Sequence, residues 1–314
     1  MRRNQDFLIN CTFAHIFVEM IIVPKNLPLI AKLQPEGLGL TDTYSGDEVP
    51  LKVLFLNLMP DKEDSEADIY RSLVKVTVPL QITLVKMSNM RYKTTPQEYM
   101  DTFYEDVAEI MERGEMYDAM IINGAPFERF EYEEIVYWKQ LCVFFRWTDK
   151  HVKSTLHICW SAFARIYYNW GIHFKRNSFQ WSGAYPHTII DKTSPLVDGT
   201  LREIVLPVSR PWYLSHDEMQ QVSEAKIIAE SPVTGPGLIV AYGGKQVYAV
   251  SHPEYGPERI KAEYFRDTQA GKNPMFPFNY FEDDDATKPV KYSWKSHRDR
   301  LFANWISEYV VRRK

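Results

Sequence analysis

Short apolar runs alternate with segments of helical period along the first half of this 314-residue chain. Runs of this kind, bounded by turn residues and followed by apolar positions three or four apart, are typical of strands that alternate with helices. The alternation predicts an α/β fold with a doubly wound, mostly parallel sheet. The expected strands are residues 52–58, 80–86, 119–122 and 154–158, and the expected helices are residues 63–75, 95–113, 132–149 and 160–172.

The second half of the chain is less regular, because proline and serine interrupt it beyond Gly171. The acidic run at residues 282–285 is expected to be a solvated loop. Gly243-Gly244 is expected to be a hairpin turn rather than a phosphate-binding loop. No repeat or long linker divides the chain, so residues 20–314 are predicted to form a single domain. Strands are expected at residues 201–207, 226–230, 238–242 and 245–250, and helices at residues 258–268 and 298–311.

The composition predicts a soluble protein with neither a nucleic-acid nor a membrane partner. The net charge of −4 provides no basic field for a phosphate backbone. No apolar run approaches the roughly 18 residues of a membrane span. Residues 1–19 are expected to be a disordered extension, or to precede a true start at Met20, because no cleavage site follows their apolar run. Cys11, Cys142 and Cys159 are widely spaced, which disfavours a disulfide framework or a metal site and fits the cytoplasm.

Cys159 lies at the junction between the expected strand 154–158 and the expected helix 160–172. A sharp turn at such a junction forms a nucleophile elbow, which lifts the side chain out of the sheet and directs backbone N–H groups towards a developing oxyanion. The start of a helix also favours the thiolate form of cysteine. The alternative is a buried structural cysteine, because free cysteines are among the most buried residues.

A histidine and a glutamate follow another strand end far downstream, in the sequence Ser251-His252-Pro253-Glu254. Catalytic groups gather at the carboxyl ends of parallel strands, so His252 is expected to meet Cys159 there. His252 would accept the thiol proton, and Glu254 would accept a hydrogen bond from the other imidazole nitrogen and fix the tautomer. The alternative is a capped turn with a solvated carboxylate.

Several short motifs are weak individually and specific together. They are Leu56-Asn57-Leu58-Met59-Pro60, Asn123-Gly124-Ala125-Pro126, Tyr137-Trp138, Ile158-Cys159-Trp160, His252-Pro253-Glu254-Tyr255, Glu263-Tyr264-Phe265-Arg266-Asp267, Asn279-Tyr280-Phe281 and Trp294-Lys295-Ser296-His297. Through them the chain resembles the homoserine O-acyltransferase family over residues 20–314. The resemblance implies a flavodoxin-like fold of the class I glutamine-amidotransferase type. It also implies a homodimer and a ping-pong reaction, in which the thiolate takes an acyl group from acyl-CoA and an amino-acid hydroxyl attacks the thioester.

The resemblance implies specific roles for the residues that match. Cys159 would be the nucleophile, His252 the general acid and base, and Glu254 the residue that orients the imidazole. Lys62 resembles the family lysine beside the oxyanion, which it would stabilise together with the backbone N–H of Trp160. Losing one such donor costs about 3 kcal/mol. Without the motif, Lys62 would be interpreted as a surface lysine at the start of a helix.

Two further residues are expected to select substrates. Arg266 resembles the arginine that holds the acceptor carboxylate, although its segment alone would be interpreted as a solvated helix face. Glu128 occupies the position where family members with glycine use succinyl donors and members with glutamate use acetyl donors. A carboxylate there would fill the acyl pocket and repel a succinyl carboxylate, which implies acetyl-CoA as co-substrate. The alternative is that Glu128 is simply one acid in the run 128–134. No bound cofactor and no metal are indicated.

The acceptor side departs from the family pattern. Gln180 stands where lysine is typical, and Val208 precedes Ser209 where the family usually has histidine. We therefore expect a changed acceptor pocket around Gln180 and Ser209. Serine and homoserine, which differ by one methylene, both remain candidates, in cysteine or methionine biosynthesis. Residues larger than usual or without an amide also follow the nucleophile, namely Ser161, Phe163 and Arg165.

Two other functions remain open from the sequence. The first is a glutamine amidotransferase or another Cys-His-Glu hydrolase on the same fold, although glycines do not flank Cys159 as that reading would require. The second is a binding protein that keeps the fold without turnover.

Overall fold

The computed structural model describes residues 20–127, 130–200 and 202–313. The strands are β1 (Ile21–Ile22), β2 (Leu40–Thr41), β3 (Leu51–Leu56), β4 (Leu80–Lys86), β5 (Tyr104–Asp106), β6 (Tyr117–Ile122), β7 (Val152–Ile158), β8 (Lys175–Ile189), β9 (Glu203–Tyr213), β10 (Ala225–Ser231), β11 (Gly235–Ala241) and β12 (Gln246–Ala249). The α-helices are α1 (Leu29–Leu33), α2 (Lys62–Ser72), α3 (Gln97–Phe103), α4 (Val107–Arg113), α5 (Trp138–His151), α6 (Trp160–Trp170), α7 (His216–Gln220), α8 (Arg259–Gln269) and α9 (Lys295–Asn304).

All of these strands belong to one sheet, in the order β2-β1-β4-β3-β6-β7-β12-β11-β10-β8-β9, with β5 paired to β4. The half from β2 to β12 is parallel, and the half from β12 to β9 is antiparallel. The predicted α/β fold with a mostly parallel, doubly wound sheet is confirmed. β11 and β12 are antiparallel neighbours joined through Gly243-Gly244, as the predicted hairpin requires.

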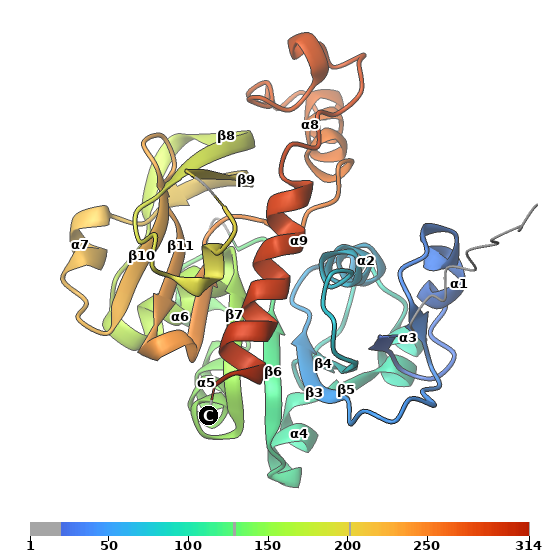
Figure 1. The fold of residues 1–314 in the computed structure, drawn as a ribbon. Coiled ribbons are helices and arrows are strands. Elements are labelled where there is room, and N and C mark those ends of the chain that lie inside the picture. The colour runs from blue at the N-terminus through green and yellow to red at the C-terminus, as the bar shows by residue number, and fades with distance from the viewer. Residues whose placement is uncertain (1–19, 128–129, 201, 314) are drawn as a thin grey trace, which may run out of the picture.

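Helices cover both faces of the parallel half. Alternate residues of a strand point to opposite faces. Val53 and Phe55 of β3 therefore pack into one core with α2 and α9, whereas Leu54 and Leu56 pack into another with α4, α5 and α6. Figure 1 shows α9 running along the same side of the sheet as α2. In the described part of the chain, every helix is too short or too polar to cross a membrane.

The expected helix at residues 95–113 is wrong in its middle. The structure has α3, then the short strand β5, then α4. β5 pairs in parallel with the end of β4, and the Tyr104 hydroxyl donates to the buried Glu66 carboxylate. A contact with a distant helix therefore overrides the local helical period. The expected helix at 132–149 begins later, at Trp138, after a short turn at Tyr132–Glu134.

The antiparallel half is more regular than the sequence indicates. β8 extends over 15 residues, Lys175–Ile189, where the sequence predicts no strand. It pairs with β9, which continues beyond the expected end at residue 207 as far as Tyr213. Pro207 and Pro211 fit there because β9 is the last strand of the sheet, and an edge strand tolerates missing N–H donors. Leu201, the first residue of the expected strand, lies outside the described residues.

The C-terminal helix begins three residues earlier than expected and changes character. α9 starts at Lys295, and the chain continues into a π-helical turn, Trp305–Val311. The acidic run contains a short turn, Glu282–Asp284, and its side chains are largely exposed, as a solvated loop requires.

Candidate active site

Cys159 forms a strained turn between β7 and α6. Its φ of 51° and ψ of −119° are unusual for a residue with a Cβ, and such conformations cost of order 1–3 kcal/mol. The Cys159 N–H donates to the carbonyl of Ala249 at 2.8 Å. The Ser161 hydroxyl donates to the carbonyl of Ile122 at 2.6 Å and accepts from the N–H of Ile158 at 2.9 Å. The turn therefore has the geometry of a nucleophile elbow, and its neighbours hold it in place.

His252 lies beside Cys159 because the two residues follow neighbouring parallel strands. Ala249 of β12 is opposite Ile158 of β7, so the two strands end at the same edge of the sheet. The N–H of His252 then donates to the carbonyl of Pro207 at 2.9 Å. His252 Nδ1 lies 2.8 Å from Glu254 Oε1, and the two side chains are only 5% and 6% exposed. The imidazole is thus buried and oriented by one carboxylate oxygen.

Gly124, which follows β6, marks the place where these side chains meet. A Cβ on Gly124 would lie 3.3 Å from Cys159 Cβ, 3.4 Å from His252 Cε1 and 3.6 Å from the backbone nitrogen of Trp160. Cys159 and His252 therefore border the same small space. The Trp160 N–H borders it as well, and the first N–H of a helix has no acceptor within that helix. Glycine keeps this space open.

The charges around His252 favour its protonated form. Burial lowers the pKa of the imidazole, but the negative charges of Cys159 and Glu254 raise it, and the net pKa lies well above the usual value. The Tyr255 ring stacks on the imidazole with ring centres 4.0 Å apart. An imidazolium beside Cys159 stabilises a thiolate and can donate a proton to a leaving group. The pair therefore suits nucleophilic catalysis at neutral pH.

Lys62 is buried at the start of α2, only 2% exposed. Its Nζ donates to the carbonyls of Asn57 and Met59, both at 2.7 Å, and lies 4.9 Å from the centre of the Tyr92 ring. Burial lowers the pKa of Lys62 to about 7, although Glu66 opposes the shift. Lys62 is therefore no surface lysine, and two of its three N–H groups are occupied by the loop after β3. Its role at the oxyanion stays a prediction.

An amide pair that the sequence did not single out links this loop to Gly124. The Asn123 side-chain amide donates to Asn57 Oδ1 at 2.7 Å, and Asn123 Oδ1 accepts from the N–H of Leu58 at 2.6 Å. The loops after β3 and β6 are thus joined at the residue before Gly124. Both asparagines belong to motifs visible in the sequence, but the contact between them is not.

Gln180 and Ser209 meet at a cavity of about 470 Å³ on the antiparallel side. The Gln180 amide donates to Ser209 Oγ at 3.0 Å, and the Ser209 hydroxyl donates to Glu263 Oε2 at 2.5 Å. The Tyr255 hydroxyl reaches the other oxygen of Glu263 at 3.4 Å. Because Tyr255 stacks on His252, this cavity is one side chain away from the imidazole. Glu263 is a lining residue that sequence reasoning did not assign.

Arg266 lies on α8 close to this cavity but is not among its lining residues. Its side chain is 66% exposed and pairs with Asp267 at 3.0 Å. The structure therefore does not bring Arg266 together with Gln180 and Ser209. Glu128 lies outside the described residues.

The substitutions after the nucleophile lie away from the 470 Å³ cavity. Ser161 braces the elbow, as described above. Arg165 is 1% exposed, pairs with Asp149 at 2.5 Å, and packs between the rings of Phe145 and Tyr168. Phe163 packs edge-on against Trp212. These residues therefore pack in the core around α6 and do not line the cavity at Gln180 and Ser209. Their effect on the acceptor pocket stays a prediction.

Arg210 is a structural residue whose role was not predicted. It is buried, and its guanidinium donates to the carbonyls of Val250, Trp212 and Thr234. Burial lowers the pKa of Arg210 to about 10, although Cys159 and Tyr185 raise it. The contact with Val250 fixes the end of β12 two residues before His252. Within the described residues, no group of three or more His, Cys, Asp or Glu side chains is arranged to hold a metal ion.

Solved structures of low sequence identity share the fold. A glutamine amidotransferase from Thermotoga maritima superposes with a TM-score of 0.55 at 13% identity, covering 84% of this chain and 99% of that chain. A glutamine amidotransferase from Methylobacillus flagellatus gives a TM-score of 0.53 at 11% identity, covering 82% of this chain and 94% of that chain. The fold is thus of the class I glutamine-amidotransferase type.

Sequence relatives are much closer. A homoserine O-acetyltransferase from Lachnospira eligens is 35% identical, over 92% of this chain and 94% of the relative. A homoserine O-succinyltransferase from Aeromonas hydrophila is 37% identical, over 92% of each chain. The family model described as homoserine O-succinyltransferase matches residues 20–314. The chain therefore belongs to the homoserine O-succinyltransferase family and is an acyltransferase.

Proposed function

We propose that the protein transfers an acetyl group from acetyl-CoA, through a thioester on Cys159, to the side-chain hydroxyl of L-homoserine or L-serine. The observation that carries the proposal is the convergence of Cys159, His252 and the Trp160 N–H around Gly124. A nucleophile, a proton carrier and an oxyanion donor at one point are the parts that acyl transfer needs.

In the first half-reaction, the Cys159 thiolate attacks the acetyl carbonyl of acetyl-CoA. The carbonyl oxygen becomes an oxyanion, which the Trp160 N–H stabilises, with Lys62 as a second donor. The intermediate collapses, the bond to the CoA sulfur breaks, and the His252 imidazolium supplies the proton that CoA carries away. Glu254 keeps Nδ1 occupied, so Nε2 is the nitrogen that exchanges this proton.

In the second half-reaction, the acceptor hydroxyl gives its proton to the now neutral His252 and attacks the thioester carbonyl. The bond to Cys159 breaks, the thiolate is restored beside an imidazolium, and the product is an O-acetyl ester. We place the acceptor at the Gln180–Ser209 cavity, because Tyr255 connects Glu263 there to His252. Arg266 would reach the acceptor carboxylate only after leaving Asp267.

The choice of acetyl-CoA rests on Glu128. Relatives of similar identity carry acetyltransferase and succinyltransferase names, so overall similarity does not select the donor. A glutamate in the wall of the acyl pocket removes volume and repels a second carboxylate. Acetyl fits such a pocket, and succinyl does not.

Glu128→Gly is expected to raise the ratio of kcat/KM for succinyl-CoA to kcat/KM for acetyl-CoA at least about tenfold, because it removes both the bulk and the charge. The matched variant Glu128→Gln keeps the bulk and removes only the charge, so it should gain less. Steady-state kinetics with both donors measure the ratio. An unchanged ratio in the glycine variant would refute the role of Glu128.

The acceptor is tested by comparing kcat/KM for homoserine and serine with acetyl-CoA. One methylene in an apolar pocket is worth about 1–3 kcal/mol, so activity with both acceptors is expected. Such a product belongs to methionine or cysteine biosynthesis.

The thioester is tested by intact-mass measurement after acetyl-CoA is added without acceptor. One acetyl group should appear on Cys159 and disappear when acceptor is added, whereas an unmodified Cys159, or ammonia released from glutamine, would contradict the proposal.

A further inference from the structure

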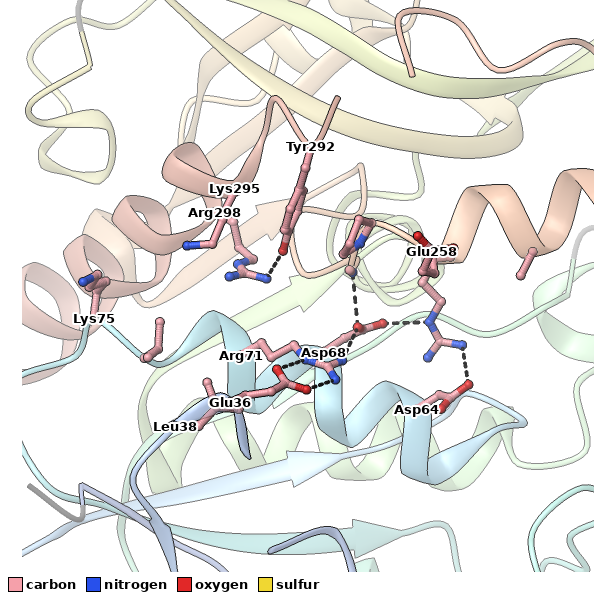
Figure 2. A pocket seen from close by; sticks show the side chains of 15 residues that line it. Glu36, Leu38, Asp64, Asp68, Arg71, Lys75, Glu258, Tyr292, Lys295 and Arg298 are labelled. Carbon is pink, nitrogen blue, oxygen red and sulfur yellow. Dashed lines mark hydrogen bonds and ion pairs between the residues drawn. The ribbon is translucent and has the colours of Figure 1, made fainter. Parts of the chain in front are cut away.

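The loop that carries His252 and Glu254 continues along a pocket of about 640 Å³ between α2, α8 and α9, shown in Figure 2. The lining of this pocket holds charges of both signs. Asp68 of α2 is 3% exposed and contacts the loop directly. The proposed mechanism does not use this carboxylate, and a buried carboxylate costs several kcal/mol unless it is well paired.

The Asp68 carboxylate holds both ends of the segment between Gly256 and Arg259. Its Oδ1 accepts from the N–H of Gly256 at 3.2 Å, and its Oδ2 accepts from Arg259 Nε at 2.7 Å. Arg71 adds an ion pair at 3.5 Å and also pairs with Glu36 at 2.6 Å. Figure 2 shows the Asp68 carboxylate beside Arg71, with Glu36 on the other side of the arginine. Helix α2 is thus tied to the start of α8 and to the loop that precedes it.

Gly256 is fitted closely to Asp68. A Cβ on Gly256 would lie 2.9 Å from Asp68 Oδ1, which is closer than real Cβ contacts. The close approach of the carboxylate therefore requires glycine here. The carboxylate and the loop backbone are packed together with no room for a side chain between them.

The orientation of the Glu254 carboxylate depends on the position of the loop backbone that carries it. Oε1 contacts His252, but the buried Oε2 has no hydrogen-bond partner among the described residues. Within the described chain, His252 is therefore the only side chain that hydrogen-bonds to this carboxylate. The amide of Gly256, two residues further along, is held by Asp68, which fixes the loop backbone on the C-terminal side of Glu254.

We infer that Asp68 is a positioning residue, which anchors the Gly256 amide and thereby directs the Glu254 carboxylate towards His252. The inference rests on the proposed function, in which Glu254 orients the imidazole. Other contacts pin the same loop: Trp294 Nε1 donates to the carbonyl of Tyr255 at 2.7 Å, and the Tyr280 hydroxyl donates to the carbonyl of Pro257. These contacts are neutral, whereas Asp68 brings a negative charge.

The charged groups around His252 and Asp68 determine how kcat is expected to depend on pH. His252 faces Cys159 from the start of α6 and faces Glu254 and Tyr255 from its own loop. Asp68 faces Arg71 on its own helix, Arg259 on α8, and Glu254 on the loop, and its charge also reaches Tyr292 beside α9. Burial raises the pKa of Asp68, and Arg259 lowers it. Loss of Asp68 loosens the Glu254–His252 contact, and the weaker contact destabilises the imidazolium.

Asp68→Ala is expected to lower kcat for acetyl transfer about tenfold, while KM for acetyl-CoA stays within about twofold. The alkaline limb of the kcat profile, where His252 loses its proton, should move to lower pH. Asp68→Asn keeps an oxygen for the Gly256 amide and should lie between Asp68→Ala and the wild type. The matched control is Asp64→Asn, since Asp64 is on the same helix, 53% exposed and 3.6 Å from Arg259. We expect the control to keep the wild-type kcat and pH profile.

The rate of Cys159 alkylation by iodoacetamide across pH provides a readout that does not depend on turnover. If wild-type Cys159 is not acetylated by acetyl-CoA, the proposed function fails, whereas the alkylation profiles still compare Asp68 variants with the wild type. Wild-type kcat and alkylation profiles in both Asp68 variants would overturn the inference. A lower Tm together with an unmoved alkaline limb of the kcat profile would also overturn the inference, because Asp68 would then have a purely structural role.

Discussion

Cys159→Ala is expected to lower kcat for acyl transfer at least about 10⁴-fold. Cys159, His252 and Glu254 act together, and without the nucleophile no thioester can form. The fold should survive, since Cys159 contributes little apolar surface and alanine is the smaller residue. The variant should also take up no acetyl group from acetyl-CoA by intact mass. Both measurements address the thioester rather than substrate binding.

Cys142→Ala provides the matched control. Cys142 lies on α5, is partly exposed, and is the other cysteine in the described residues. Burial raises the pKa of the Cys142 thiol to about 11, so at neutral pH it is a poor nucleophile. We expect this variant to keep the wild-type kcat and the single acetyl adduct. Residual turnover in Cys159→Ala within about tenfold of wild type would contradict covalent catalysis through this sulfur.

The position of the nucleophile and the base could be predicted from the sequence because each follows a short run that is typical of a strand. Ile158 and Ala249 end β7 and β12, and the parallel pairing of these strands brings the next residues to one edge. The rule that functional side chains gather at carboxyl strand ends was sufficient to predict that Cys159 and His252 meet. Distance along the chain was no obstacle, because the sheet order determines which strand ends are neighbours.

The parts of the fold that sequence reasoning missed depend on partners far away in the chain. β5 exists because Tyr104 reaches Glu66 and its backbone pairs with β4, and neither contact is visible in residues 95–113 alone. β9 contains prolines that normally argue against a strand, yet it is an edge strand, where they are tolerated. Local patterns record propensity, whereas these elements are determined by tertiary pairing.

The same limit applies to the site. The motif that contains Gly124 was visible, but the need for glycine appears only when Cys159 Cβ and His252 Cε1 are found within 3.4 Å of the same point. Asp68 was invisible, since its contacts with Gly256 and Arg259 span almost 200 residues of sequence. Arg266 illustrates the opposite case: the motif was present, and the side chain pairs with its neighbour Asp267 rather than lining the cavity.

Glu254→Gln is expected to lower kcat about 10³- to 10⁴-fold, as loss of the orienting carboxylate does in comparable triads. Glutamine has nearly the same shape, so the fold should be retained. The carboxylate fixes the imidazole tautomer and stabilises the imidazolium, and an amide can present its N–H to Nδ1 and select the wrong tautomer. Steady-state kcat with acetyl-CoA and homoserine measures the loss.

The pH dependence of the Glu254→Gln variant gives the sharper result. In the wild type, burial lowers the pKa of His252, while the charges of Cys159 and Glu254 raise it to a net value well above the usual one. Activity that needs the imidazolium is therefore present at neutral pH and lost as the pH rises through this raised pKa. Without the Glu254 charge the pKa of His252 falls, so the alkaline limb of the kcat profile should move to lower pH. The imidazolium then stabilises the Cys159 thiolate less, so the rise of iodoacetamide alkylation with pH should move to higher pH. An unmoved limb would mean that Glu254 does not stabilise the imidazolium, and the role of Glu254 in catalysis would have to be assigned elsewhere.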